Sequence, residues 1–276
     1  MNRLIGTLSL LGLFFTNIFA EDELKTSNNP DISFTYEKGF IGVLGHIIQF
    51  GIDGSEINYV KEAGQDVLLP YERYTAEINF KEKHSLIFLA QPFDLLTTEI
   101  LRRDIMIDSL LFPKGTIVDF KYGFTFYRIS YLYDFKNGDK EFSLGASFQI
   151  RNADISFTSK DKSLLKRNSN IGPVPILKFR GKIPFKNIYW VGAELDGFYA
   201  SGKYITGSKN DFEGAILDCS IQSGVNLNKH LQTFLNARYI GGGAKGNENN
   251  PDRPGGGYTN NWLKTLALSV GLTYKP

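Results

Sequence analysis

The chain has a single cysteine, Cys219, among its 276 residues. One cysteine excludes a disulfide within the chain. After the first twenty residues, no stretch approaches the roughly 20 consecutive apolar residues that a transmembrane helix needs. The 31 basic residues nearly balance the 29 acidic ones, and no basic block interleaves with aromatic residues. The charge pattern therefore disfavours nucleic acid as a partner.

The N-terminus has the layout of a secretory signal peptide. Arg3 precedes an apolar run between Leu4 and Phe19, and the small residue Ala20 follows. We predict cleavage after Ala20; an uncleaved membrane anchor is the alternative, although the run is barely long enough to span. No cysteine lies near the cut, so we do not expect a lipoprotein anchor. The expected parts are a signal peptide (1–20), a periplasmic lead-in (21–38) and one β-domain (39–276).

Residues 117–159 form the clearest structural unit in the sequence. They read as two long antiparallel strands joined by a tight turn at Asn137-Gly138, because both of these residues tolerate positive φ. One face of each arm is almost wholly apolar, and the other carries charged and small polar residues. A long strand with these two faces suits lipid on one side and a polar lumen on the other.

The same two-faced pattern recurs along the chain and predicts about ten strands. Their ranges are 39–51, 71–80, 85–93, the two arms of 117–159, 174–185, 188–204, 212–227, 231–242 and 262–274. Short turns alternate with longer connections at 52–70, 94–116, 160–173, 206–211 and 243–261. Bacterial outer-membrane barrels show this asymmetry, with short periplasmic turns and longer extracellular loops.

We therefore predict an all-β fold, an antiparallel up-and-down transmembrane β-barrel of about 10 strands, with 8–12 possible. In the last strand Leu266, Leu268, Val270, Leu272 and Tyr274 alternate with small residues. This strand resembles the C-terminal assembly signal of bacterial outer-membrane β-barrel proteins, although Lys275-Pro276 follow the terminal aromatic. The resemblance implies secretion, a place in the bacterial cell outer membrane, and outer-membrane lipids and the assembly machinery as partners.

Charged residues on the inward faces predict a polar network in the lumen. Its members are Arg73, Glu77, Arg128, Arg151, Asp154, Lys178, Arg180, Glu194, Asp196, Asp218 and Arg238. In each arm of 117–159 the polar residues shift from odd-numbered to even-numbered positions, and Arg128, Arg151 and Asp154 lie near these shifts. One extra residue in each strand, a β-bulge, would explain the shift. A barrel of about ten strands is mostly filled by side chains, so an internal electrostatic lock is favoured over a narrow path, a ligand pocket or a catalytic cluster.

Few residues suit catalysis. His46 is expected in the first strand, and His84 and His230 at short turns. Ten strands would suit an omptin-like protease, but the acidic pair and the Asp–His couple of such enzymes have no visible match. Glu194 and Asp196 could share a proton or bind a cation, yet a salt network with Lys178 and Arg180 is favoured. We expect no catalytic residues, no metal and no cofactor.

The connection 94–116 is too apolar for a solvated loop. It is expected to extend the hairpin above the membrane or to fold inward as a plug, with contact to a surface partner as a further possibility. The sequence thus favours an outer-membrane, porin-like barrel with a filled polar lumen and a structural, narrow-channel or surface-interaction role. A lipid- or peptide-hydrolysing enzyme of the outer membrane and a secreted soluble β-barrel that binds a small apolar ligand stay open as alternatives.

Overall fold

The computed structural model describes residues 30–135, 139–186, 188–202, 212–247 and 257–276. Its strands are β1 (Asp31–Phe50), β2 (Ile57–Asn58), β3 (Leu68–Phe80), β4 (His84–Gln91), β5 (Asp94–Ile100), β6 (Ile105–Ile107), β7 (Leu110–Phe112), β8 (Ile117–Asp134), β9 (Glu141–Ser159), β10 (Leu165–Phe185), β11 (Tyr189–Ser201), β12 (Glu213–Asn226), β13 (Leu231–Gly246) and β14 (Thr259–Tyr274). One short helix, α2 (Tyr59–Glu62), follows β2. In the described part of the chain, no helix is long and apolar enough to cross a membrane.

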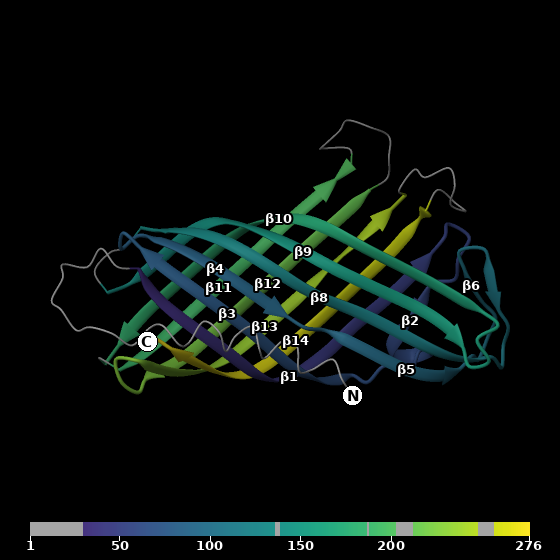
Figure 1. The fold of residues 1–276 in the computed structure, drawn as a ribbon, viewed down its shortest axis with the longest axis horizontal. Helices are drawn as coiled ribbons and strands as arrows, with labels where there is room; N and C mark the ends of the chain where they lie inside the picture. Colours follow the sequence, from purple (N-terminus) through teal and green to yellow (C-terminus); the bar gives the residue numbers. More distant parts are fainter. Residues whose placement is uncertain (1–29, 136–138, 187, 203–211, 248–256) are drawn as a thin grey trace. The chain divides into compact units, whose positions relative to one another are not determined.

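Ten antiparallel strands close into a barrel, as the sequence predicted (Figure 1). β4 and β5 together count as one of the ten barrel strands, because both pair with β8 and the pairing register continues unchanged from one to the other. Pairing of β1 with β14 closes the sheet. A path that starts at Asp31 and steps from each residue to its partner on the next strand goes once around the barrel. It returns to β1 at Val43, twelve residues further along the strand. This stagger gives the strands the tilt that a closed barrel requires.

Apolar side chains cover the outside of much of the barrel. Along β14, Leu266, Leu268, Val270 and Leu272 are exposed while the residues between them face inward. Near the short turns, the outer surface carries the exposed aromatic residues Phe142, Phe185, Tyr189 and Tyr274. An apolar belt edged by aromatic residues is the outer surface of a membrane-spanning barrel. A soluble barrel that holds an apolar ligand would have the opposite distribution, so this alternative does not fit.

The central hairpin of β8 and β9 corrects one prediction. Its register runs without interruption from Val118–Ser159 to Asp134–Ser143, so neither strand carries the expected bulge. The polarity of each face inverts instead. Inward positions are polar near the short turn and apolar further along, where Phe120 and Phe157 are buried. The strands leave the apolar belt there, so their outer face becomes polar and their inner face becomes a dry core. The one register shift in the β1–β14 pairing lies between Val43 and Gly45.

The long-loop end of the barrel is filled by an apolar core, which we call the cap. Its buried members come from the ends of β1, β5, β8 and β9, from the segment 57–63 and from the turn region 101–112. Tyr59 on α2 packs edge-on against Phe120, Tyr122 and Phe157. The connection 94–116 both extends the β8 ladder, through β5, and buries Ile105, Ile107 and Phe112 in the cap. Both expected roles of this connection, extended hairpin and plug, therefore occur together.

Several boundaries differ from the expected ones. β1 begins at Asp31, so residues 31–38 belong to the barrel and not to a lead-in. β10 begins at Leu165, inside the segment expected to be a polar connection, because its polar side chains lie beyond the apolar belt. The signal peptide, the turn at Asn137-Gly138 and the connection 206–211 lie outside the described residues.

Candidate functional site: a ring of charges across the lumen

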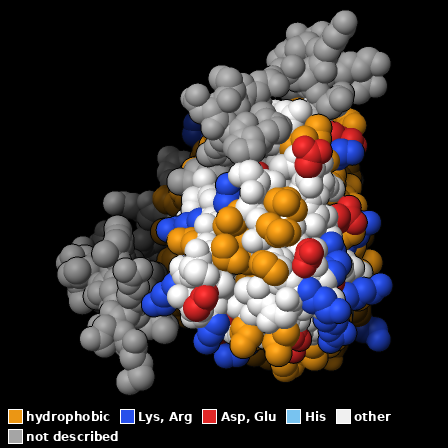
Figure 2. Space-filling model, turned by 90° about the vertical axis from the view of Figure 1, so that its right-hand side faces the viewer, with side chains coloured by type: hydrophobic (Ala, Val, Ile, Leu, Met, Phe, Trp, Pro, Cys, Tyr) orange, Lys and Arg blue, Asp and Glu red, His pale blue; other side chains and the backbone are white. Residues whose placement is uncertain are grey.

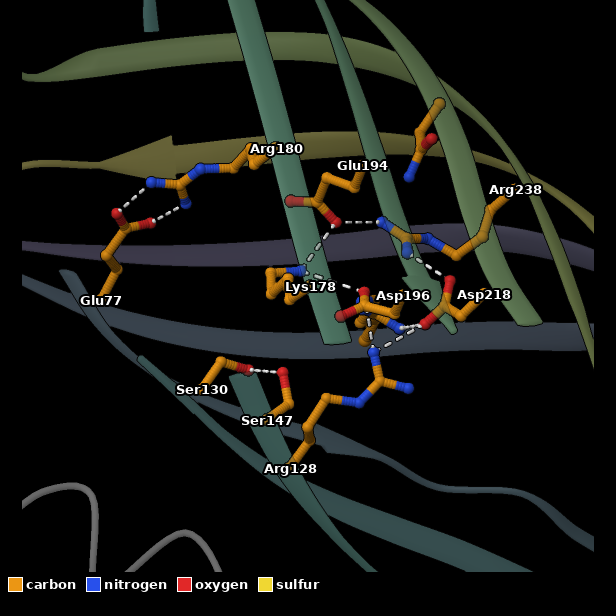
Figure 3. Close-up of polar contacts among 12 residues, drawn as sticks. Glu77, Arg128, Ser130, Ser147, Lys178, Arg180, Glu194, Asp196, Asp218 and Arg238 are labelled. Atoms are coloured by element: carbon orange, nitrogen blue, oxygen red, sulfur yellow. Dashed lines mark hydrogen bonds and ion pairs between the residues drawn. The ribbon is translucent and has the colours of Figure 1, made fainter. Parts of the chain in front are cut away.

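Six charges, five of them buried and one, Glu194, half-buried, form a closed ring in the middle of the lumen, with acids and bases in alternation (Figure 3). In order, they are Arg128, Asp218, Arg238, Glu194, Lys178 and Asp196. Arg128 Nη1 lies 3.0 Å from Asp218 Oδ2 and 3.0 Å from Asp196 Oδ2. Arg238 donates to Asp218 at 2.6 Å and to Glu194 at 3.0 Å. Lys178 closes the ring, at 3.0 Å from Asp196 and 3.7 Å from Glu194.

Neutral and charged neighbours hold this ring in place. Gln149 accepts from Arg128 at 3.0 and 2.7 Å. Arg73 lies 3.5 Å from Asp218 and 3.8 Å from Glu37, and donates to Gln91 at 2.8 Å. Buried charges are tolerated when their partners have good geometry, and here each charge of the ring has two oppositely charged partners.

A second group lies beside the ring on the side of the short turns. Arg180 donates to both carboxylate oxygens of Glu77 at 2.8 Å and also to Glu141. A bidentate arginine–carboxylate pair is among the stronger polar contacts in proteins. β10 and β3, which carry Arg180 and Glu77, do not pair with each other in the sheet. This contact therefore reaches across the lumen.

The ring also joins strands that are not neighbours. Arg128 stands on β8 and Asp218 on β12, while Arg73 on β3 reaches the same carboxylate. Arg128, Arg238, Asp196 and Asp218 are at most 3% exposed. These contacts therefore cross the lumen at this level.

Nine of the eleven residues expected in the lumen lie in these two groups: Arg73, Glu77, Arg128, Lys178, Arg180, Glu194, Asp196, Asp218 and Arg238. Asp154 was assigned to the wrong face. It accepts from Lys121 at 2.5 Å and from Arg167 at 2.7 Å, and it alternates with the buried residues Ala153 and Ile155. The assumed bulge caused the error, because without it Asp154 faces outward. The side chain of Arg151 lies outside the described part of the structure.

Two acidic members of the network were not expected. Glu37 was placed in the lead-in, yet it is buried and accepts from Asn236 at 2.7 Å and Ser269 at 2.8 Å. The alternation of Ser33, Thr35 and Glu37 with Phe34 and Tyr36 is the signal that could have revealed it. Glu141 adjoins the turn, where a charged residue gives no indication of which way it points.

Each of the three histidines has a hydrogen-bond contact in the structure. His46 is fully buried in the cap, where its Nδ1 lies 2.5 Å from Gln65 Oε1 and its ring packs against Tyr59 and Tyr122. His84 contacts the Tyr131 hydroxyl, and His230 contacts the Lys275 carbonyl. The side-chain partners of His46 and His84 are thus an amide and a phenol. Within the described residues, no group of three or more His, Cys, Asp and Glu side chains could hold a metal ion.

A closed antiparallel barrel with an apolar outer belt and a charged lumen defines the class of bacterial outer-membrane β-barrels. The outer membrane protease OmpT from Escherichia coli is a similar solved structure, with a TM-score of 0.51 and 11% identity over 92% of this chain and 99% of that one. The likeness to OmpT shows a shared fold.

Two other similar structures have lower TM-scores. The transport unit of the autotransporter AIDA-I from Escherichia coli has a TM-score of 0.41, with 7% identity over 98% of this chain and 97% of that one. A Pseudomonas aeruginosa FadL homologue has a TM-score of 0.36, with 9% identity over 89% of each chain. No protein-family model matches the chain, and no curated protein matches it.

Proposed function

We propose that the protein is a non-conducting outer-membrane barrel that acts through its long-loop end at the cell surface. The observation that carries this proposal is that side chains reach across the lumen or fill it at two levels. The charge ring joins opposite walls in the middle, and the cap fills the long-loop end with buried apolar side chains. A solute would have to displace both, so a structural or interaction role is favoured over a narrow channel.

The exposed surface of the long-loop end supports an interaction role. Figure 2 shows apolar side chains gathered in the middle of this end, with basic and acidic side chains around them. Exposed apolar residues in the connections and strand ends of this region include Ile52, Ile100, Leu111, Ile117 and Leu165. Apolar patches with a polar rim commonly mark contact sites. In this proposal the long loops face outward from the cell, the outer belt takes outer-membrane lipid, and β14 serves as the assembly signal.

Planar-bilayer recording tests the obstruction. The purified protein is expected to give no steady single-channel current, whereas an open porin inserted under the same conditions serves as the positive control. Outer-membrane fractionation and heat-modifiable gel mobility of the same preparation report whether the barrel is folded and in the membrane. Stable ohmic pores from the folded wild-type protein would overturn the proposal.

A further inference from the structure

A polar cluster lies on the outer, lipid-facing surface of β1 and β3. It consists of Tyr36, Lys38, Glu72 and Tyr74, and we call it the Glu72 cluster. The hydroxyls of Tyr36 and Tyr74 donate to the two oxygens of Glu72 at 3.0 and 2.8 Å, and their rings stack with centroids 5.1 Å apart. Lys38 Nζ lies 3.6 Å from Glu72 Oε1. The carboxylate is thus held in a fixed position on the outside of the barrel.

This cluster interrupts an otherwise apolar surface. Along β1 the outward residues around Lys38 are Phe34, Phe40 and Leu44, which are 40%, 62% and 63% exposed. On the paired strand β14, Leu268 and Val270 are also exposed beside it. A charge pair surrounded by lipid is costly, and ionisable residues in such surroundings usually mark a functional contact.

The geometry leaves Lys38 in need of a partner. Its side chain is 69% exposed, and its one ion pair among the described residues is long for a charge-assisted hydrogen bond. An ammonium has three donors, and lipid tails accept none of them. An anionic lipid headgroup would meet the Glu72 carboxylate next to Lys38 and be repelled. A surface with the same pair of opposite charges is complementary to it.

We propose that this face is the interface of a homodimer in the membrane, with Lys38 of each copy bound to Glu72 of the other. A two-fold axis beside the cluster brings the same two residues together twice, which is how a self-complementary interface works. The inference uses the membrane placement proposed above, which gel mobility and fractionation test separately.

Charge exchange between two tagged copies tests the interface. The variants are Lys38→Glu and Glu72→Lys, each made with two different affinity tags and folded into the same vesicles, and co-purification of the tags is measured. Each variant carries two like charges on the face, so self-association of either alone should fall by about tenfold or more relative to wild type. Mixing Lys38→Glu with Glu72→Lys should restore co-purification, because both cross-chain pairs are then opposite in sign.

Ile221→Glu is the matched control, because it places a charge on the lipid-facing surface of β12, away from the Glu72 cluster. It should co-purify as wild type does, and heat-modifiable mobility should show that every variant is folded. Wild-type copies that do not co-purify at any protein-to-lipid ratio would overturn the proposal. Loss of association without restoration in the mixture would also overturn it, and would indicate that Lys38 binds a lipid headgroup or acts within one chain.

Discussion

Asp218 shows at the scale of one residue how the charges in the lumen depend on one another. Its carboxylate, which is fully buried, faces the guanidinium groups of Arg73, Arg128 and Arg238. The three arginines repel one another unless the Asp218 carboxylate is ionised and further carboxylates balance their charge. Glu37, Glu194 and Asp196 do this, because each forms an ion pair with one of the three arginines. The negative charge of Asp218 is therefore needed to balance the positive charges of the network.

Removal of this carboxylate should destabilise the barrel strongly. Asp218→Ala leaves three buried arginines short of a partner, so the free energy of unfolding should fall by about 3–5 kcal/mol. Urea unfolding in lipid vesicles, followed by tryptophan fluorescence, measures it. Asp154→Ala is the matched control, because Asp154 forms its ion pairs on the outer face, where such pairs contribute about 0–1 kcal/mol. Equal losses for the two variants would contradict the assigned positions.

At the scale of elements, the cap depends on contacts between loops that are distant in sequence. Glu62 on α2 accepts from Arg103 Nε at 2.7 Å and from the Asn58 amide at 2.9 Å. Arg103 also donates to the Glu56 carbonyl at 2.6 Å. These bonds attach the segment 56–62 to the turn after β5. Partial burial raises the pKa of the Glu62 carboxyl, but the bonds from Arg103 and Asn58 lower it more, so its pKa lies below the usual value of 4.5.

The cap should therefore loosen in acid. A carboxyl whose pKa is lower in the folded state stabilises that state above its unfolded pKa, and this stabilisation is lost as the pH falls through the folded pKa. Below a pH of about 4.5 we expect faster opening of residues 56–62 and 101–104. Hydrogen exchange corrected for the intrinsic pH dependence measures it. Glu62→Gln should open more readily at neutral pH and lose most of the pH dependence; a pH dependence equal to that of wild type would contradict the assignment.

At the scale of the whole molecule, the pairing of β1 with β14 turns a sheet into a barrel. Phe40 pairs with Leu268 on the outer surface of this seam. Directly opposed residues of antiparallel strands have Cα atoms about 4.5–5.5 Å apart, which is within the range of a disulfide. Closure can therefore be tested by a cross-link between the two ends of the barrel.

In a Cys219→Ser background, Phe40→Cys with Leu268→Cys should form a disulfide on mild oxidation. The product should keep the mass of one chain and migrate differently from its reduced form on a denaturing gel. Phe40→Cys with Leu272→Cys is the control, because Leu272 pairs with Tyr36 and is thus displaced by four residues, or about 13 Å, along the strand. A cross-link of similar yield in the control pair would contradict the register.

Much of the barrel was predictable because each strand carries a local signal. Alternation on strands such as β3, β12 and β14 identified their lipid-facing sides, and nine lumen residues followed from the same kind of alternation. The error at Asp154 arose because a two-residue period shows which residues share a face but not which face points inward. Beyond the apolar belt the outer face of the strands is polar and the inner face is apolar, so the polarity of a residue no longer shows whether it points inward. Glu37 was missed because its strand begins before the apolar pattern is strong.

The sequence by itself determined the class of fold, the asymmetry of the connections and the set of charges available to the lumen, because strand alternation and turn residues act over a few neighbouring positions. Only the tertiary structure decided which charges meet. Arg128 and Asp218 are 90 residues apart, and Arg180 and Glu77 are 103 apart. Their pairing depends on the stagger of the closed barrel, which is a property of all ten strands together. The same closure decides that the apolar connection 94–116 folds into a cap.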